Sequence, residues 1–474
     1  MRIITNYEKL KEEFILILNL FYSKEKVENS SDELILNIFD NKTNFVMSLT
    51  YKNKTYKKSF SLTDDEMKNK FKYIKKNAKV FLYEVVSRIE HKKIPYGSLT
   101  GIRPTKLFHE LLAECGNFNK VEKILLNDYK VSKNKVKLLG KIVRNQTIDK
   151  VQNKVDLYIN IPFCTSKCYY CSFISLPIDK CSQFVEPYIN ALIKDIKNAL
   201  KMIKQKKLVL ENIYMGGGTP SSLSADQLEK ILQVLPKDIS EFTVECGRPD
   251  TISKEKLEVL EKMGVTRISV NPQTFNDKTL QLIGRSHNSK ETIEAYNLAR
   301  NYNFKINMDL IAGLGEEKLK DFKSTLLKTI SLNPDNITVH TLCLKRASSL
   351  NLEGGKTSNE IEVEKMVKFS INKLLKNGYN PYYLYKQKNA LANLENIGYF
   401  KGDSICKFNV NSMEETRSVV ACGANAISKY LEIESNRIER VAFVKEPKEY
   451  IERLDEMLIK REKLFKDINN CKKR

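Results

Sequence analysis

The stretch from Tyr158 to Phe173 reads YINIPFCTSKCYYCSF, and the rest of the chain is organised around it. The residues that lead into it, Val155–Ile161, alternate apolar and polar side chains, which predicts a buried strand. Pro162 cannot donate a hydrogen bond to a neighbouring strand, so the strand is expected to end there. Cysteines in the spacing C-x3-C-x2-C then follow on a loop at the carboxyl end of a strand, where open α/β sheets and barrels keep their chemistry. These cysteines are Cys164, Cys168 and Cys171.

Three thiolates on one loop point to a metal centre. A tetrahedral zinc site needs a fourth ligand, and no histidine stands near the loop in the sequence. The histidines are His91, His109, His287 and His340. Three thiolates suit a four-iron cluster, [4Fe-4S], that leaves one iron open for a substrate or cofactor. The alternative is that the cysteines are buried apolar side chains, which their tight spacing on a loop disfavours.

From residue 155 onward the sequence alternates strand and helix patterns. Strands are predicted at 156–161, 211–215, 241–245, 266–270, 305–311 and 335–340. Helices are predicted at 182–204, 224–235, 253–263, 289–302 and 316–331. Six βα units in succession imply parallel strands joined by right-handed crossovers. Because a closed barrel needs eight, we expect an α/β fold with an open, partial (βα)6 barrel, whose open side suits a large substrate.

Glycine and polar residues recur at the ends of the predicted strands. The second strand is followed by Gly216–Pro220, reading GGGTP, and glycine lets a backbone approach a ligand closely. Later strands end near Glu245, Gln273 and Asp309, and Arg285 follows Gln273 by twelve residues. A glycine triplet alone is often a tight turn, and a lone Glu is often a solvated cap. The carboxyl ends of parallel strands meet at one edge, however, so these residues are expected to line one site.

Together these motifs resemble those of radical S-adenosylmethionine (SAM) enzymes, and in particular the oxygen-independent coproporphyrinogen III oxidases. The resemblance rests on Y-x-x-I-P-F-C, the aromatic residue before the last cysteine, GGGTP, the strand-end Glu, the Gln of R-I-S-V-N-P-Q, the later Arg, and D-L-I-A-G-L. It covers residues 155 to about 345 well and continues more loosely to about 430. The motif L-T-G-I-R-P-T-K and the segment Tyr382–Tyr399 are similar to the HemZ branch of this family.

The resemblance implies a radical SAM fold with a [4Fe-4S] cluster and one or two SAM molecules. It implies that the three cysteines bind the cluster, that SAM chelates the open iron, and that one electron from the cluster breaks a sulfur–carbon bond of SAM. It gives catalytic roles to Tyr158, Glu245 and Arg285. The residues that it implies around SAM are Tyr158, Gly217, Gly218, Thr219, Glu245, Gln273, Arg285 and Asp309.

The sequence departs from the family pattern in two places. Well-studied bacterial members have a histidine two residues after the tyrosine, whereas this chain has Asn160, which cannot titrate near neutral pH. Ser172-Phe173 replaces a glycine–cysteine pair after the third ligand. The resemblance therefore implies the cluster and SAM more directly than it implies the tetrapyrrole reaction.

The part of the chain before the barrel has a different pattern. Residues 1–150 are expected to form an N-terminal α+β accessory domain with a helical linker. Glu33–Phe39 and Asn44–Tyr51 predict a hairpin, which Lys54–Ser61 could extend, and Asp64–His91 predicts a long helix.

The remainder of the chain is divided in two. Residues 151–345 are expected to be the radical SAM core, and residues 346–474 a mostly helical C-terminal extension. Within the extension, Tyr382–Lys388 is aromatic and basic. This segment is predicted either to meet a flat macrocycle with carboxylates or to be an edge strand with a solvated basic face.

Composition indicates a globular protein with a strong positive charge. The 474 residues are 42% hydrophobic and carry a net charge of +22. No apolar run approaches the length of about 18 residues that a membrane span needs. With no signal-peptide pattern and ten cysteines, reduced thiols and a cytoplasmic location are expected. No arginine-rich or aromatic-interleaved groove is visible, so we expect a polyanionic substrate or an acidic electron donor, such as flavodoxin or ferredoxin, rather than nucleic acid.

Three functions fit the sequence, and all of them involve a tetrapyrrole. The leading one is oxidative decarboxylation of coproporphyrinogen III, which turns propionates into vinyl groups in porphyrin and haem biosynthesis. The alternatives are a haem-active radical SAM methyltransferase and a non-catalytic haem-binding chaperone. A chaperone would retain haem without cleaving SAM.

Overall fold

A computed structural model describes residues 1–172, 175–344, 348, 350 and 356–465. The chain divides into two compact units, Met1–Val143 and Arg144–Arg474. Each unit has its own hydrophobic core and is described by itself. Phe173 and the last residues of the expected extension, 466–474, lie outside the described residues.

The first unit is built on a four-stranded sheet in the order β1-β2-β3-β4. Its strands are β1 (Arg2–Thr5), β2 (Glu33–Asn41), β3 (Asn44–Tyr51) and β4 (Lys54–Ser61). The predicted hairpin and its third strand are confirmed. The first strand, which pairs parallel to β2, was not expected, because four residues are too few to show a period.

Helices supply the rest of the first unit. They are α1 (Lys11–Leu18), α2 (Lys24–Asn29), α3 (Asp64–Met67), α4 (Lys70–Ile89), α5 (Pro104–Cys115), α6 (Phe118–Asn127) and α7 (Lys133–Asn145), the last of which runs past Val143. The helix expected over 64–91 is divided into α3 and α4. Leu36 and Phe45 from the sheet and Leu82 from α4 are fully buried in one core.

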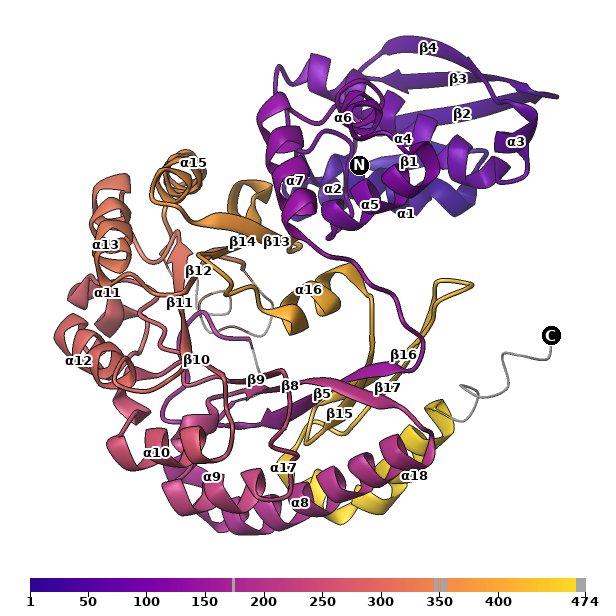
Figure 1. Cartoon of the computed structure of the whole chain (residues 1–474). Helices are drawn as coiled ribbons and strands as arrows, with labels where there is room; N and C mark the ends of the chain where they lie inside the picture. The colour runs from indigo at the N-terminus through magenta and orange to yellow at the C-terminus, as the bar shows by residue number, and fades with distance from the viewer. Residues whose placement is uncertain (173–174, 345–347, 349, 351–355, 466–474) are drawn as a thin grey trace. The chain divides into compact units, whose positions relative to one another are not determined.

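Six parallel strands of the second unit match the predicted βα repeats. They are β5 (Lys154–Ile161), β8 (Val209–Gly217), β9 (Glu241–Val244), β10 (Arg267–Ser269), β11 (Lys305–Ala312) and β12 (Asn336–Thr341). They stand side by side in chain order, as successive βα units predict. The crossover helices are α8 (Ser182–Gln205), α9 (Ala225–Leu232), α10 (Lys254–Lys262), α11 (Asp277–Leu282), α12 (Ser289–Ala299) and α13 (Leu319–Leu332). Figure 1 shows the crossover helices on the outer side of a curved, open sheet. The partial barrel is confirmed.

The expectation that residues 346–474 are mostly helical is wrong. This part adds β13 (Asn380–Lys386), β14 (Glu395–Phe400), β15 (Ser418–Cys422), β16 (Ile427–Glu432) and β17 (Arg437–Ala442) to the same sheet. Its helices are α15 (Glu360–Lys376), α16 (Lys407–Glu414), α17 (Pro447–Glu452) and α18 (Leu454–Leu464). A short apolar run such as that of β15 cannot be told from a buried helix by periodicity.

The added strands widen the sheet at both ends. β15 pairs parallel to β5, and β16 and β17 follow it in antiparallel order. At the other end β14 pairs antiparallel to β12, and β13 forms the outermost strand.

Helix α16 is anchored to the inner side of the barrel. The carboxylate of Glu241, on β9, accepts hydrogen bonds from the backbone N–H groups of Lys407 and Phe408, at 2.8 and 2.9 Å. The ring of Phe408 stacks on Tyr214 of β8, with 4.5 Å between centroids. These contacts satisfy the free N–H groups at the start of the helix and hold it beside the strand ends.

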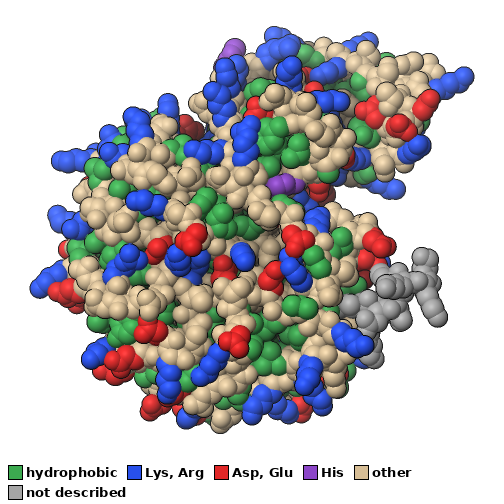
Figure 2. Space-filling view, in the orientation of Figure 1, with side chains coloured by type: hydrophobic (Ala, Val, Ile, Leu, Met, Phe, Trp, Pro, Cys, Tyr) green, Lys and Arg blue, Asp and Glu red, His purple; other side chains and the backbone are tan. Residues whose placement is uncertain are grey.

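Charged side chains are spread over the surface. Figure 2 shows Lys and Arg interspersed with Asp and Glu on the visible face. None of the helices in the described part of the chain combines the length and apolar character of a membrane span.

Candidate active site

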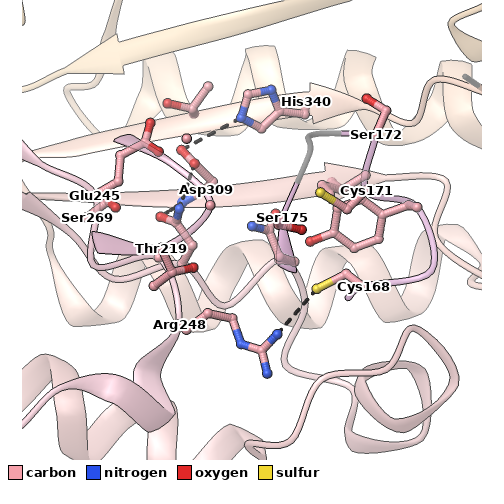
Figure 3. A pocket seen from close by; sticks show the side chains of 18 of the residues that line it. Cys168, Cys171, Ser172, Ser175, Thr219, Glu245, Arg248, Ser269, Asp309 and His340 are labelled. Carbon is pink, nitrogen blue, oxygen red and sulfur yellow. Dashed lines mark hydrogen bonds and ion pairs between the residues drawn. The ribbon is translucent and has the colours of Figure 1, made fainter. Parts of the chain in front are cut away.

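A cavity of about 380 Å³ opens at the carboxyl ends of the parallel strands. Its walls come from the cysteine loop after β5, from residues on and just after β8 to β12, and from β13 and α16. Figure 3 shows the thiols of Cys168 and Cys171 on one side of this space and Glu245, Asp309 and His340 across from them. The expected gathering of strand-end residues in one site is therefore what the structure contains.

All three predicted cluster ligands line this cavity as free thiols. Cys164 ends the short strand β6 (Phe163–Cys164), and a backbone hydrogen bond of 3.0 Å from Cys171 to Cys168 closes the loop between the other two. In the described part of the chain, no three His, Cys, Asp or Glu side chains are grouped to hold a single ion. A four-iron cluster has no such need, because each thiolate binds a different iron. The donor set fits that cluster.

The glycine loop is interlocked with the cysteine loop. Gly217 has φ +110°, and a Cβ there would lie 2.2 Å from Oδ1 of Asn160. A Cβ on Gly218 would lie 2.3 Å from the carbonyl oxygen of Phe163, so only glycine fits this approach. Thr219 follows, with its hydroxyl oxygen 3.2 Å from Sγ of Cys164. This loop therefore fixes the first cluster ligand and forms part of the cavity wall.

Glu245 is a half-buried carboxylate on the cavity wall. The Tyr214 hydroxyl donates to its Oε1 at 2.6 Å. Burial raises the pKa of Glu245 to about 7, and the nearby negative charge of Asp309 adds to the effect, although the Tyr214 hydrogen bond opposes it. At neutral pH this group can therefore hold or release a proton, or accept a hydrogen bond from a ligand.

Gln273 and Arg285 present polar atoms that lack a protein partner. Oε1 of Gln273 and Nε of Arg285 are buried, and neither makes a hydrogen bond to a residue that the structure describes. The Arg285 guanidinium also donates to two backbone carbonyls, at 2.9 and 3.1 Å, and to the Tyr170 hydroxyl at 3.0 Å. A buried orphan acceptor and a buried orphan donor are costly unless a ligand completes them. The hydroxyls and carboxylate of SAM have the chemistry to do so.

Asp309 belongs to a polar group that includes a histidine the sequence reasoning did not assign. Amides of Asn271 and Asn307 donate to its carboxylate at 2.8 and 2.7 Å, and Nε2 of His340 lies 3.7 Å from it. Burial would raise the pKa of Asp309, but His340 first, and then Asn307 and Thr338, hold it below the ordinary value. Nδ1 of His340 lies 3.3 Å from the Tyr385 hydroxyl. The position of His340 near the carboxyl end of β12 was the available signal.

Tyr158 is placed differently from the other predicted residues. It is not among the residues that line the cavity. Its hydroxyl donates to Oδ1 of Asn160 at 3.1 Å, and its ring stacks beside Tyr214, with 6.3 Å between centroids. A direct contact between Tyr158 and SAM stays a prediction.

The aromatic and basic segment forms the edge strand β13. Its alternate residues Tyr383 and Tyr385 line the cavity, and Gln387 follows them. Two residues along a strand return to the same face, which is why both phenols point the same way. The strand lies at the edge of the sheet, as one interpretation predicted, but the solvated basic face of that interpretation is wrong, because Lys386 is buried. The two tyrosines give the cavity a flat aromatic wall.

Sequence reasoning also missed Arg248. It lies two residues beyond Cys246, is 2% exposed, and lines the cavity next to Cys168. A single arginine in a loop gives no pattern from which burial can be read.

The comparisons with known proteins agree with this geometry. The radical SAM superfamily model matches residues 158–328. The chain is 36% identical over 457 residues to the oxygen-independent coproporphyrinogen-III oxidase-like protein HemZ of Bacillus subtilis, covering 94% of this chain and 88% of that protein. It is 38% identical over 195 residues to the heme chaperone HemW of the same organism, covering 40% of this chain and 50% of HemW.

A solved structure shares the fold. The coproporphyrinogen III oxidase HemN of Escherichia coli, described as a radical SAM enzyme, superimposes with a TM-score of 0.50 and 21% identity over 65% of this chain and 70% of that one. Radical SAM proteins use a [4Fe-4S] cluster and SAM, and the thiols, glycines and orphan polar atoms of the cavity fit both. The chain belongs to the radical SAM superfamily, in the family of oxygen-independent coproporphyrinogen-III oxidase-like proteins that includes HemZ.

Proposed function

We propose that the protein catalyses the oxidative decarboxylation of coproporphyrinogen III, converting propionate side chains to vinyl groups. The observation that carries this proposal is the joint presence, around one cavity, of the three cluster thiols, all the predicted SAM residues except Tyr158, and the tyrosines of β13. The similarity to HemZ over nearly the whole chain, including the part after the barrel, supports the same reaction.

Within this proposal the chain binds and orients its cofactors from the strand ends. Cys164, Cys168 and Cys171 would hold the cluster. Gln273 and Arg285 would complete their orphan atoms on SAM, and Gly217 and Gly218 let the glycine loop pack closely against the residues that lead into the cluster loop. When bound, the cluster and SAM supply a radical that takes a hydrogen atom from the substrate. The protein's own contribution is to exclude water and to hold the reacting carbon in reach.

The chemistry balances without an acid–base step at the substrate. Each propionate loses one hydrogen atom from its β-carbon, one molecule of CO2 and one electron, and a carbon–carbon double bond forms. The carboxylate is already ionised at neutral pH, so no residue has to remove its proton. The electron goes to an external acceptor, and a one-electron donor such as flavodoxin or ferredoxin reduces the cluster.

The wall formed by Tyr383 and Tyr385 would meet the substrate. Phenol rings offer a flat apolar surface with a polar tip, which suits a macrocycle whose edge carries carboxylates. His340, beside Tyr385, would give that edge a group able to donate a hydrogen bond. The net charge of +22 favours the approach of a tetracarboxylate.

The test is anaerobic reconstitution followed by product analysis. With coproporphyrinogen III, SAM, a reductant and an electron acceptor, we expect SAM cleavage and a product lighter by two formic acid units. Deuterium placed at the propionate β-carbon should appear in 5′-deoxyadenosine. The Cys168→Ala protein is the matched control and should give neither product.

Two other outcomes would replace the proposal. Methyl transfer to haem, with no loss of CO2, would make the protein a haem methyltransferase. Tight haem retention with no SAM cleavage would make it a haem chaperone, the function in the name of its HemW relative.

A further inference from the structure

Arg248 is a buried arginine with every donor engaged. Its Nε and Nη2 donate to the two carboxylate oxygens of Asp250, at 3.1 and 3.4 Å, and Nη2 also donates to the Ser286 hydroxyl at 3.3 Å. Nη1 donates to the hydroxyl and the carbonyl of Ser166, at 3.0 and 3.4 Å, and to Sγ of Cys168 at 3.5 Å. A planar guanidinium provides five N–H groups in a fixed fork, which a lysine cannot imitate.

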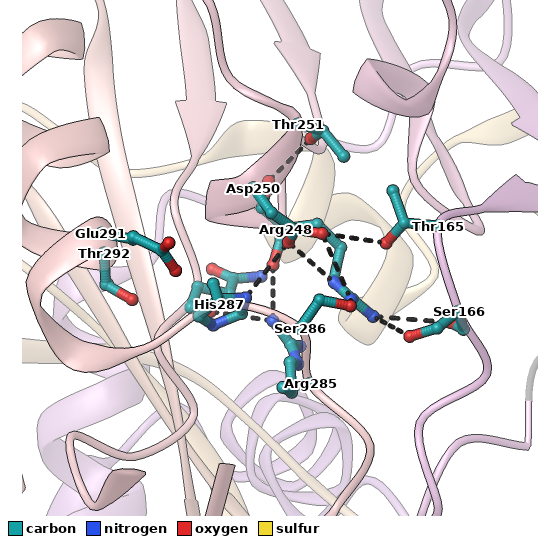
Figure 4. Close-up of polar contacts among 12 residues, drawn as sticks. Thr165, Ser166, Arg248, Asp250, Thr251, Arg285, Ser286, His287, Glu291 and Thr292 are labelled. Carbon is teal, nitrogen blue, oxygen red and sulfur yellow. Dashed lines mark hydrogen bonds and ion pairs between the residues drawn. The ribbon is translucent and has the colours of Figure 1, made fainter. Parts of the chain in front are cut away.

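Asp250 and His287 fix the position of this guanidinium. Figure 4 shows both side chains against Arg248, together with the hydroxyl of Thr165. Burial would raise the pKa of Asp250, but the hydrogen bonds from His287 and Arg248 outweigh it and hold the pKa well below the usual range. Because an ionised carboxylate only accepts, Nδ1 of His287 is the donor in their 3.1 Å contact.

This network ties three separate loops together. Thr165, Ser166 and Cys168 come from the cysteine loop; Arg248 and Asp250 follow β9; and Ser286 and His287 lie between α11 and α12. The hydroxyl of Ser166 also donates to the carbonyl of Gly284 at 2.9 Å. The thiol of Cys168 therefore accepts a hydrogen bond from a preorganised cation.

We propose that Arg248 is a positioning residue for Cys168 whose hydrogen bond to that sulfur raises the reduction potential of the bound cluster. The proposal concerns the reduction potential of the cluster, so it does not depend on which tetrapyrrole is the substrate. Figure 3 shows the guanidinium directed at the Cys168 sulfur from the cavity wall.

The direction of the effect follows from charge. Reduction adds one electron to the cluster and its thiolates, with no bond broken and no proton moved, so the reduced form is more negative by one charge. A buried cation that donates to a ligand sulfur stabilises the more negative form. Low dielectric surroundings keep this interaction from being screened. Arg248 thus makes the cluster easier to reduce for a one-electron donor.

The test is a reductive titration of the reconstituted cluster, followed by electron paramagnetic resonance, in the absence of substrate and SAM. For Arg248→Gln we expect near-normal iron content and a more negative midpoint potential. The expected loss in the reduction equilibrium is about tenfold, equal to about 59 mV for a one-electron couple. An unchanged midpoint at full iron content would overturn the proposal.

Two further variants guard against a folding artefact. Arg248→Lys keeps the charge but cannot donate to Asp250 and Cys168 together. Its midpoint potential should therefore shift in the same direction as that of Arg248→Gln, but by less. An unchanged midpoint in this variant would also contradict a role for the hydrogen bond. Arg461→Lys is the matched control, because Arg461 is a fully buried arginine that donates to Sγ of Cys422 at 3.2 Å, far in sequence from the cluster loop. It should lower the melting temperature and leave the midpoint alone, and an equal shift there would defeat the assignment.

Because no substrate is present, this experiment stands apart from the proposed reaction. A failed decarboxylation assay leaves the midpoint shift measurable. A normal midpoint in Arg248→Gln leaves the decarboxylation open to its own test.

Discussion

Replacing Glu245 with glutamine should stabilise the cofactor-free protein at alkaline pH. Burial raises the pKa of Glu245 from its ordinary value of 4.5 to about 7. Between these values the folded state keeps a proton that the unfolded state has lost, so stability falls as pH rises. The full loss of folding free energy is about 3 kcal/mol, because each pKa unit corresponds to about 1.36 kcal/mol. Glu245 is only partly buried on the cavity wall, so solvent screening reduces this value, and we therefore expect about 1 to 2 kcal/mol.

Glutamine is a suitable replacement because its Oε1 can still accept from the Tyr214 hydroxyl. The assay is urea unfolding of wild type and Glu245→Gln, without cluster or SAM, at about pH 5 and about pH 8.5, on either side of the raised pKa. Burial also raises the pKa values of Asp156 and Glu317 to about 7, and this background is common to both proteins. The variant should gain stability only at the higher pH. The reasoning would be refuted if the variant and wild type were equally stable at both pH values, or if the variant were less stable than wild type at about pH 8.5.

Three further predictions concern the cofactor loops and the division of the chain. Cys168→Ala should lose the brown cluster chromophore and its iron, whereas Cys181→Ala, whose thiol donates to a backbone carbonyl at 3.0 Å, should keep both. Gly217→Val should keep the cluster and weaken SAM binding at least tenfold by calorimetry, because its Cβ would meet Oδ1 of Asn160 at 2.2 Å; unchanged binding would make the loop a simple turn. Limited proteolysis should cut first within 145–154, and earlier cuts inside the βα repeats would contradict a separable first domain.

The parallel core could be predicted because the local sequence pattern of each strand and helix agrees with the structure that it forms. Each of the six strands is a short apolar run bounded by turn residues, and each is followed by an amphipathic helix. The strands after Lys376 lack that alternation, and they join the sheet through pairings with β5 and β12. Such pairings are tertiary and leave little local trace, which is why the extension was expected to be helical.

The residues of the candidate site also divide into those that the sequence predicts and those that it does not. Glu245, Gln273 and Asp309 could be predicted because they stand at strand ends, and the fold brings strand ends together. Arg248 and His340 could not be assigned, because their roles depend on what faces them from other loops. The same applies to Tyr385, whose partner His340 comes from a strand two positions away in the sheet.

Position 160 shows how one substitution changes what the site can do. The amide of Asn160 donates to the carbonyl of Ala424 at 2.7 Å, and its Oδ1 accepts from Tyr158 and lies against Gly217. The side-chain amide thus links the Tyr158 hydroxyl to the turn after β15, beside the glycine loop. A residue so engaged cannot also hand a proton to a ligand, and it does not line the cavity. The imidazole that does face the cavity is that of His340, at the opposite end of the six parallel strands. Proton transfer near the substrate, where the reaction uses it, therefore has to be sought at His340 and Glu245 rather than at position 160.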